Sequence, residues 1–423
     1  MSVLHRRAFL RGSLGGLGAL SLTGCVQGFD GVSALAPDNA TEFPGADTLF
    51  LTWQRDPTTT MTIQWIGPEP TGDVAVLSAK AAAPVWRRQV VTTKPYPGTS
   101  SRVYRCELTG LDPGEEYGFQ IGAATRMYRF RTMPAKATDT IQFVSGGDAG
   151  VNEHAVATNL LAARQDPWFA LIGGDLAYDN GRSPDTFTGF LKNYHAQMRD
   201  STGRLIPMIS CIGNHEVQGG YNATREKSPQ YLSVFDGFFA ETTYGVLDIG
   251  DYLSIVLLDT GHIAPISGAQ TDWLGGVLKE RQERPHLIVA NHVPAYPSVR
   301  SPQGGGGKFG TGEEQRQHWC PLFEQYKVDV VLEHHDHAFK RTHPLTDGRY
   351  DKHGVVYLGD GSWGKLRGPH PPEERPYLAR TAGSYHVTVH RLEGEERFHV
   401  AIEDSGKVAD VCATRNKRPS RRG

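Results

Sequence analysis

Short runs in which apolar and polar residues alternate dominate the first part of the chain, from about residue 46 to residue 134. Successive side chains of a strand point to opposite faces, so alternation is typical of strands with one buried face. Pro, Gly and Asp separate the runs, as between the strands of a sandwich of antiparallel sheets. The pattern therefore predicts an N-terminal β-sandwich over residues 46–134. Its runs read LFLTWQ, MTIQWIG, VAVLSA, RVYRCELTGL, YGFQIG and YRFRTMP.

The pattern changes after Pro134, where continuous apolar runs end in Gly, Asp, Asn or His. Strands that are apolar along their whole length belong in sheets covered on both faces. Between them, HAVATNLLAARQ and FTGFLKNYHAQM carry apolar residues at steps of three and four, which predicts helices. The alternating segment YHVTVHRLEGEERFHVAIEDSGKVAD predicts antiparallel hairpins that finish the sheet. Residues 139–408 are therefore predicted to form an α/β domain.

The composition fits a globular protein of two domains, with 44 Lys and Arg against 46 Asp and Glu in 423 residues. Because these charges nearly cancel, nothing in the balance favours a nucleic acid or a membrane surface as a partner. Five basic residues lie between Arg415 and Arg422. We interpret the tail, residues 409–423, as a solvated basic end.

The N-terminal segment HRRAFLRG carries the pair Arg6 and Arg7, and the mild apolar run GSLGGLGALSLTGC follows it. This pattern predicts a twin-arginine export signal over residues 1–25. The run is too short and too rich in Gly for a spanning helix, which needs roughly 20 apolar residues. Its ending LTGC resembles a bacterial lipobox, which implies lipidation of Cys25; the alternative is cleavage by an ordinary signal peptidase.

We therefore expect an exported protein, periplasmic or at the cell surface, that touches the membrane only through a lipid anchor on Cys25. The small, polar residues 26–45 read as a linker. An oxidising compartment allows disulfides, and Cys106, Cys211, Cys320 and Cys412 remain for them in three possible pairings.

Residues that can bind metals recur where the apolar runs end, in the motifs GGDAG, GGDLAY, GNHE, VANH and HHDH. Such strand ends are where α/β domains build their sites. One Asp there is more often a helix cap, and one His is more often a hydrogen-bonded core residue. Seven together are hard to obtain by chance. They are Asp148, Asp175, Tyr178, Asn214, His292, His335 and His337.

The order of these motifs resembles the metallophosphoesterase family, and within it the purple acid phosphatases, whose pattern is GDxG, GDxxY, GNHE, VxxH and GHxH. The resemblance covers about residues 139–400 and implies a two-sheet core flanked by helices. The sandwich resembles the N-terminal domain of plant-type purple acid phosphatases. Its segment from LTGLDPGEEYGFQIG to YRFRTMP resembles a fibronectin type III-like module, with Tyr117 in the place of that module's core tyrosine.

One substitution marks the subgroup. Most relatives have a histidine two residues after the first aspartate, but this chain has Gly150 after Asp148, and Tyr178 stands where other relatives have Asp or Asn. A phenolate is a hard oxygen donor that suits Fe(III). The resemblance implies that Fe(III) is held by Asp148, Asp175, Tyr178 and His337.

The resemblance also implies a second, divalent ion, which could be zinc, manganese or iron. Its ligands would be Asp175, Asn214, His292 and His335, with Asp175 bridging the two ions. Two cations about 3.5–4 Å apart need a shared anion between them, and a carboxylate supplies it. If the strand period continues past Glu333, the rings of His335 and His337 point the same way and that of His334 points the other way.

His215, next to Asn214, is not a ligand in this assignment. We expect it to contact the phosphate and, when protonated, to serve the leaving oxygen as an acid, with Asp175 as the second catalytic residue and Asn214 as a further substrate contact. Glu216 would orient His215; the alternative is a purely structural His215. His334 replaces the glycine of GHxH, and this departure has no assigned role.

Plant relatives carry further substrate-binding histidines after VxxH, but here the segment is PAYPSVRSPQGGGGKFG, which has none. Tyr296, Arg300 and Lys308 are the candidates there for gripping an anionic group. The alternative is that QGGGGKFG is only a surface loop.

The function that the sequence predicts is an exported dinuclear phosphoesterase, most simply an acid phosphatase that hydrolyses phosphomonoesters with a hydroxide generated on the metals. A phosphodiesterase or nucleotidase using the same site is one alternative. The other is a surface-tethered binding protein without catalysis, against which the intact set of seven ligands counts.

Overall fold

The computed structural model of the chain describes residues 40–137, 140–305 and 308–415. The predicted export signal with Arg6, Arg7 and Cys25 lies outside these residues, as do most of the predicted linker and the end of the predicted tail. Among the residues that are described, no helix has the length and apolar character needed to cross a membrane.

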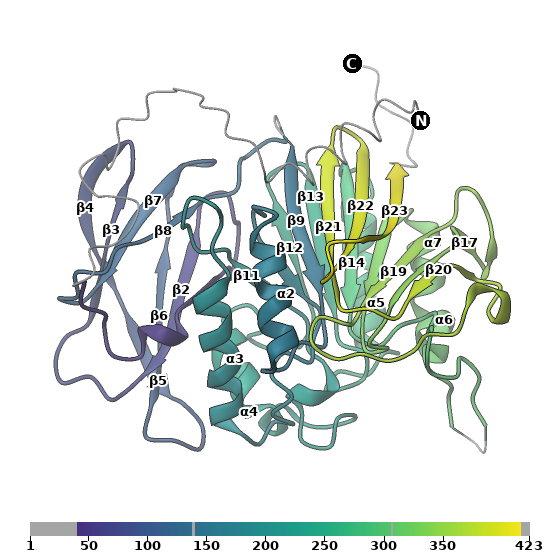
Figure 1. The fold of residues 1–423 in the computed structure, drawn as a ribbon, viewed down its shortest axis with the longest axis horizontal. Helices are drawn as coiled ribbons and strands as arrows, with labels where there is room; N and C mark the ends of the chain where they lie inside the picture. Colours follow the sequence, from purple (N-terminus) through teal and green to yellow (C-terminus); the bar gives the residue numbers. More distant parts are fainter. Residues whose placement is uncertain (1–39, 138–139, 306–307, 416–423) are drawn as a thin grey trace.

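The N-terminal domain consists of two four-stranded antiparallel sheets whose buried faces share one core (Figure 1). The predicted alternation is visible in β8 (Tyr128–Arg131), where Tyr128 and Phe130 are buried and the two arginines are partly exposed. The first sheet has the order β1 (Phe50–Thr52), β2 (Met61–Gly67), β6 (Arg102–Leu108), β5 (Thr92–Pro95). The second has the order β4 (Ala83–Val90), β3 (Ala75–Lys80), β7 (Glu116–Ile121), β8.

The second domain contains a six-stranded and a seven-stranded mixed sheet. The six-stranded sheet has the order β11 (Met208–Ser210), β10 (Ala170–Ile172), β9 (Ile141–Gly146), β21 (His386–Glu393), β22 (Glu396–Glu403), β23 (Val408–Arg415). The seven-stranded sheet has the order β12 (Gly245–Ile249), β13 (Leu253–Leu258), β14 (His286–Asn291), β15 (Val330–Glu333), β19 (Val356–Asp360), β16 (Phe339–Thr342), β20 (Leu378–Ala382). A small hairpin pairs β17 (Leu345–Thr346) with β18 (Arg349–Tyr350).

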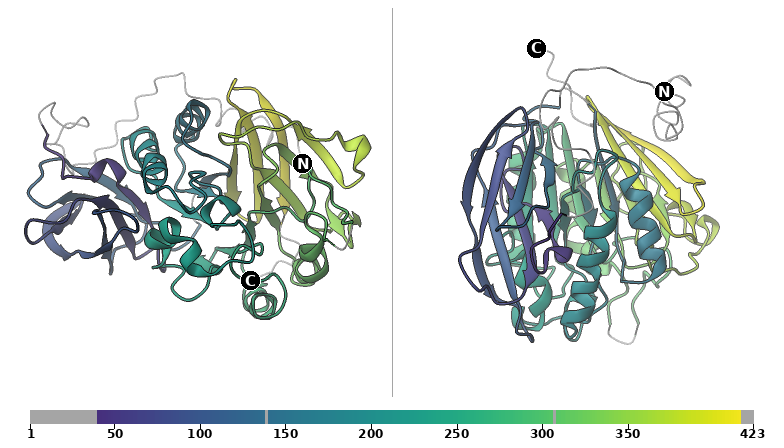
Figure 2. Two further views of the ribbon diagram at one scale, coloured as in Figure 1. Left: turned by 90° about the horizontal axis from the view of Figure 1, so that it is seen from below. Right: turned by 60° about the vertical axis from the view of Figure 1, so that its left-hand side comes forward.

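Helices cover this core on its outer faces (Figures 1 and 2). The α-helices are α2 (Glu153–Ala163), α3 (Pro184–Gln197), α4 (Pro229–Phe235), α5 (Ala269–Arg281), α6 (Glu313–His318) and α7 (Cys320–Gln325). The short 3-10 helices are η1 (Ala46–Thr48), η2 (Asn214–Glu216), η3 (Arg225–Lys227) and η4 (Pro372–Glu374). Both predicted helices are present as α2 and α3, and each begins at a side-chain cap, Asn152 and Ser183 respectively.

Strand β14 shows why the continuous apolar runs form a sheet covered on both faces. Ile288 and Ala290 belong to the core between the two sheets, whereas Leu287 and Val289 belong to a second core with α5 and α7. Since the side chains alternate, both faces must be apolar, and the run is therefore continuous. The predicted fold class, a sheet domain followed by an α/β domain, is confirmed.

The two domains share one hydrophobic core across their junction. Trp53 packs edge-on against Phe169 with ring centroids 6.1 Å apart, and Phe50 lies 5.8 Å from Phe235. Gln64 donates to the Val234 carbonyl at 2.8 Å. The sandwich and the α/β domain are therefore packed against each other through a shared hydrophobic core.

The C-terminal end of the domain differs from the sequence-based prediction, which placed a solvated tail from residue 409. Strand β23 continues to Arg415 and pairs with β22 along its length, past a register shift between Ala401 and Ile402. In this strand Ala409 belongs to the core, and Val408, Val411 and Ala413 pack against it. The sequence obscured this strand because its short apolar pattern runs directly into the basic residues that begin at Arg415. Cys106, Cys211 and Cys320 form no disulfide in the described part of the chain, so none of the three pairings left open by the sequence is present.

Candidate metal centre

All seven predicted ligands follow the carboxyl ends of strands or lie in the loops just after them. Strands β9, β10 and β11 run parallel in one sheet, and β14 and β15 run parallel in the other. Parallel strands end at the same edge, so these loops meet across the gap between the sheets. The structure brings all seven side chains together there.

Three of them form a group that we call the first donor cluster: Asp148, Tyr178 and His337. The Tyr178 hydroxyl lies 3.1 Å from Asp148 Oδ1 and 3.0 Å from His337 Nε2. The third side of the triangle, from His337 Nε2 to Asp148 Oδ1, is 3.0 Å. Three strong donor atoms thus face one point.

The other four form the second donor cluster: Asp175, Asn214, His292 and His335. His292 Nε2 is at its centre, 3.2 Å from Asp175 Oδ2, 3.2 Å from Asn214 Oδ1 and 3.1 Å from His335 Nδ1. Its Nδ1 bonds the Gly173 carbonyl at 2.9 Å, which fixes the ring with Nε2 turned inward.

The donor sets fit metal ions. Ligand atoms about 2.1 Å from one cation lie roughly 3.0–3.4 Å from one another, as these do. One potential ligand atom from each of Asp148, Asp175, His292 and His335 lies within 4.8 Å of the others, so the two clusters adjoin. Asp175 Oδ2 is buried and accepts no hydrogen bond among the described residues. A buried carboxylate oxygen without such a partner is suited to binding a cation.

The backbone at the site is held in an uncommon conformation. Five of the seven residues have φ between 54° and 67°, in the left-handed region that side chains larger than glycine rarely adopt. These residues are Asp148, Asp175, Tyr178, His335 and His337. Such backbone strain persists only where the surrounding structure enforces it, and strained residues cluster at functional sites.

This conformation corrects one step of the sequence argument. Strand β15 ends at Glu333, so His335 and His337 do not continue its two-residue period. Two left-handed residues instead turn the rings apart, His335 toward His292 and His337 toward Tyr178. One histidine therefore lies in each donor cluster, through these turns rather than through the strand period.

Burial and neighbouring charges move the pKa values of these groups. Burial raises the pKa of the Tyr178 hydroxyl, and the Asp148 carboxylate raises it further. Burial acts to raise the pKa of Asp175, but the facing His292 outweighs it and holds the pKa below its usual range. Burial acts to lower the pKa of His292, and Asp175 more than offsets this and raises it to about 9. Large opposed shifts of this kind are typical of functional sites.

His215 lies at the edge of both clusters and is partly exposed. Its Nε2 is 3.9 Å from Asp175 Oδ2, and its ring packs on Tyr178 with centroids 4.1 Å apart. Its Nδ1 bonds Asn180 Oδ1, so Nε2 is the nitrogen turned toward the donors. This is the position that a residue contacting a bound phosphate would take.

Two family models match the chain. Residues 46–132 match the N-terminal domain of purple acid phosphatases, and residues 140–339 match the calcineurin-like phosphoesterases. Together they cover about two thirds of the sequence. This chain is a purple acid phosphatase-like member of the calcineurin-like phosphoesterase family.

Relatives in the family are distant in sequence. Purple acid phosphatase 21 of Arabidopsis thaliana is 26% identical over 290 residues, which are 64% of this chain and 60% of that protein. Acid phosphatase type 7 of Homo sapiens is 25% identical over 427 residues, 91% of this chain and 92% of that one. The chain spans about 60% of the length of the first plant relatives that it matches.

Solved structures show the same fold. A purple acid phosphatase, PPD1, from yellow lupin seeds superposes with a TM-score of 0.70 at 16% identity, covering 86% of this chain and 73% of that one. The structure of PhoD gives a TM-score of 0.63 at 11% identity, covering 89% and 90%.

His334, which replaces the glycine of the family motif GHxH, has a packing role. Its ring is buried against Gly147 and Gly173, where an added Cβ would lie 2.7 Å and 1.9 Å from ring atoms. His334 Nδ1 bonds the Asn291 carbonyl at 2.9 Å. The ring therefore fills the space beneath the two strand ends that carry Asp148 and Asp175.

Glu216 does not orient His215, contrary to the sequence-based expectation. Its carboxylate accepts the backbone N–H groups of Asp175 at 2.8 Å, Leu176 at 2.7 Å and Gly213 at 2.8 Å. These bonds cross from one ligand-bearing loop to the next, so Glu216 holds the ligand backbone, and Asn180 is the partner of His215. Asn180 was missed because an asparagine in a polar loop carries no distinctive sequence signal.

The three predicted substrate contacts lie in different surroundings. Tyr296 is 4% exposed and packs against Tyr357 and Tyr377 in the second core, with α5 and α7. Arg300 does lie beside the site, where it donates to the His335 carbonyl and to Asp336 Oδ1 at 2.9 Å. Asp336 thereby holds the guanidinium of Arg300. Lys308 is exposed, next to the two residues 306–307 that are not described.

Two basic residues near the first donor cluster were not singled out from the sequence. Lys365 Nζ lies 4.4 Å from the centre of the Tyr178 ring, and Arg367 Nε lies 3.3 Å from His337 Nδ1. Both follow GDGSWG, whose Trp363 and Gly364 bond the backbone of Gly147 and Asp148. The basic residues directly after this motif were the signal available in the sequence.

Proposed function

We propose that this protein is a dinuclear phosphoesterase, most simply an acid phosphatase that hydrolyses phosphomonoesters. The observation that carries the proposal is the pair of adjoining donor clusters, each with donor atoms 3.0–3.2 Å apart and with buried carboxylates at their junction. Two cations side by side in a cleft of this kind are the usual machinery for in-line displacement at phosphorus.

The chemistry of the donors suggests which metals bind. The first donor cluster, with two hard oxygen donors and one imidazole, suits Fe(III), and the second suits zinc, manganese or iron in the divalent state. Asp175 is the proposed bridge. When bound, such a pair of ions supplies an activated water and neutralises charge on the phosphate.

The chain's own residues would bind and orient the substrate. His215 Nε2 and the Asn214 amide face the space in front of the donors, so both can contact a phosphate oxygen. Because Asn180 engages Nδ1, a protonated His215 presents its second N–H to the leaving oxygen. Lys365 and Arg367 add positive charge at the rim, where they attract a phosphate dianion.

A direct test measures metal content and ester preference together. The purified protein should hold two metal ions per chain and hydrolyse a phosphomonoester such as 4-nitrophenyl phosphate at acid pH, much faster than the bis-ester. Asp175→Asn should lose both ions together if Asp175 bridges them. A faster bis-ester reaction would favour the phosphodiesterase alternative. Two bound ions without hydrolysis of either ester would favour the binding-protein alternative.

We also propose export by the twin-arginine route with lipid attachment at Cys25, on the sequence pattern alone. Arg6→Lys with Arg7→Lys should block export. Cys25→Ser should leave an exported protein free of membranes. Membrane attachment that survives Cys25→Ser would contradict the anchor.

A further inference from the structure

A cavity of about 260 Å³ opens from the second donor cluster, since His335 forms part of its wall. Loops distant in sequence complete it: Tyr221 and Asn222 come from the loop after η2, Thr260 follows β13, and residues 309–315 lead into α6. Its volume is somewhat below that of pockets for drug-sized ligands, about 300–1,000 Å³, and suits one or two rings. A group bound there would lie next to a phosphate held at the metals.

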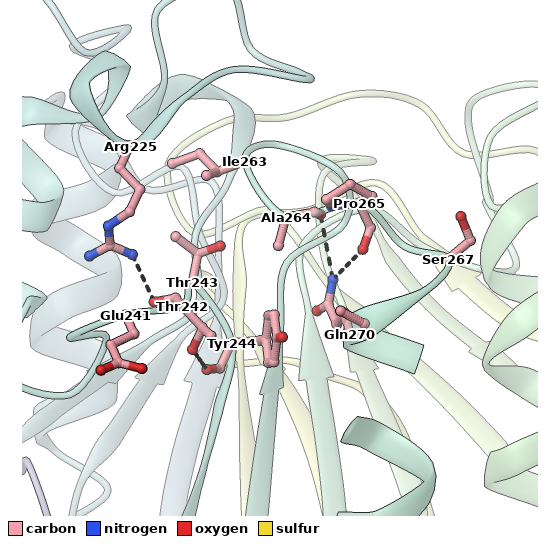
Figure 3. A pocket seen from close by; sticks show the side chains of 11 residues that line it. Arg225, Glu241, Thr242, Thr243, Tyr244, Ile263, Ala264, Pro265, Ser267 and Gln270 are labelled. Carbon is pink, nitrogen blue, oxygen red and sulfur yellow. Dashed lines mark hydrogen bonds between the residues drawn. The ribbon is translucent and has the colours of Figure 1, made fainter. Parts of the chain in front are cut away.

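A second cavity, of about 250 Å³, lies away from the ligand set (Figure 3). Its polar side chains bond their own surroundings: Arg225 donates to the Thr242 carbonyl at 3.0 Å, and Gln270 donates to the Pro265 carbonyl at 2.9 Å. None of the seven predicted ligands is among the residues that line it. Of these two cavities, the one beside His335 is therefore connected to the donor clusters.

Two aromatic side chains in the cavity beside His335 are exposed, Phe309 by 64% and Tyr221 by 43%. The Tyr221 hydroxyl lies 3.5 Å from His335 Nε2, and its ring lies 4.9 Å from that of His262. One exposed aromatic residue is ordinary, but two in one cavity next to a reactive centre offer a surface for a ring to stack on.

The charges around this cavity select against anionic groups. The described residues that line it include one carboxylate, Glu314, and no lysine or arginine. Arg300 nearby is held by Asp336, and the basic pair Lys365 and Arg367 lies on the Tyr178 side of the site. A leaving group with a further phosphate would therefore meet the Glu314 carboxylate, whereas the charge of Arg300 is already paired with Asp336.

We propose that this cavity binds the leaving group and selects phosphomonoesters of uncharged alcohols that carry an aromatic ring, over polyphosphates. The proposal rests on the phosphatase function proposed above. In the reaction a P–O bond forms to water and the P–O bond to the leaving oxygen breaks. The leaving oxygen takes one proton and departs as the neutral alcohol, and the other product is inorganic phosphate.

The test compares three substrates on the full-length, metal-loaded protein: 1-naphthyl phosphate, glycerol 2-phosphate and inorganic pyrophosphate. Phe309→Ala should raise KM for the naphthyl ester by about 3- to 10-fold, with little change in kcat or in the kinetics of the glycerol ester. Tyr350→Ala, at another exposed aromatic residue outside the cavity, is the matched control and should change nothing. Equal effects on the naphthyl and glycerol esters would overturn the proposal.

A charge reversal tests the electrostatic part independently. Glu314→Lys should lower KM for pyrophosphate several-fold and leave the glycerol ester unchanged; an unchanged preference would overturn the proposal. Calorimetry with 1-naphthyl phosphonate, which is not hydrolysed, provides a readout without turnover, and Phe309→Ala should weaken this binding by the same factor. Hydrolysis of the esters with no response to either variant rejects the cavity alone, whereas absence of hydrolysis of every ester rejects the phosphatase function.

Discussion

At the scale of single residues, the proposed preference of the first donor cluster for Fe(III) rests on Tyr178. Its hydroxyl lies 3.1 Å from Asp148 Oδ1 and 3.0 Å from His337 Nε2, at a corner of the donor triangle. Burial raises the pKa of this phenol. A highly charged cation is therefore needed to bind it as a phenolate, and Fe(III) suits this hard donor.

The protein should accordingly be coloured by charge transfer from the Tyr178 phenolate to Fe(III). Tyr178→Phe should bleach the visible band, because phenylalanine has no oxygen to donate. Absorption spectra with iron analysis check this, and Tyr350→Phe, at an exposed tyrosine, should leave the band unchanged. A colourless protein with a full complement of iron would contradict the assignment.

His215 should matter for turnover but not for metal binding, because its ring lies at the edge of the donor clusters. His215→Ala should keep both ions and lower kcat by about 10²–10⁴, the range expected for loss of a general acid. Metal analysis and steady-state kinetics separate the two effects. His353→Ala, at an exposed histidine, is the control, and an unchanged kcat in His215→Ala would assign His215 a structural role.

The sequence predicted which residues gather at the site better than it predicted what holds them. Asp148, Asp175 and His292 could be found because the residue type and the apolar run before it are visible in a few consecutive residues of the sequence. The roles of Glu216 and Arg300 depend on which backbone groups another loop presents to them. Such partners are set by the fold and have no periodic signal.

At the scale of elements, the turns after β9 and β10 pack against the ring of His334, which lies in the loop after β15. Gly147 and Gly173 lie on His334, and an added Cβ at Gly173 would lie 1.9 Å from the ring. The sequence showed that His334 departs from the family motif but could not show that it contacts Gly147 and Gly173, because both glycines are more than 150 residues away in the chain.

Gly173→Ala should therefore destabilise the protein by about 1–3 kcal/mol, the usual cost of overpacking a tight interior. Urea denaturation measures this. Adding His334→Gly to Gly173→Ala removes the clash and should recover part of the loss. Gly276→Ala in α5, where a Cβ meets nothing within 4 Å, is the control and should be neutral or slightly stabilising. Strictly additive losses in the double variant would contradict the proposed contact.

At the scale of the whole molecule, the sequence predicted two domains but not how firmly they are joined. Alternation within a strand reveals a buried face and not what covers it. In the structure, Trp53 and Phe169 pack across the junction, and Arg131 lies over the Trp168 ring at 3.4 Å. The shared core makes the sandwich a support for α3 and for the loops that α3 follows, so the two domains should unfold together.

His195 on α3 makes that junction sensitive to acid. Its Nδ1 bonds the Leu49 carbonyl of the N-terminal domain at 2.8 Å, and Arg199 Nη2 lies 3.0 Å from its Nε2. Burial lowers the pKa of His195 to about 4, and the positive charge of Arg199 contributes, because both disfavour a charged ring. The unfolded chain binds the proton near pH 6.5, so stability is full above that pH and falls as the pH drops toward 4.

Thermal unfolding between pH 7.5 and 4 should show this loss. Because one proton is involved, His195 contributes at most about 1.4 kcal/mol per pH unit within the window. His195→Gln cannot titrate, so it should lower Tm at neutral pH by weakening the junction yet make Tm less dependent on pH below 6.5. His318→Gln, on α6 and away from the junction, is the control. Parallel Tm profiles for the wild type and His195→Gln would show that His195 is not the acid-sensitive group.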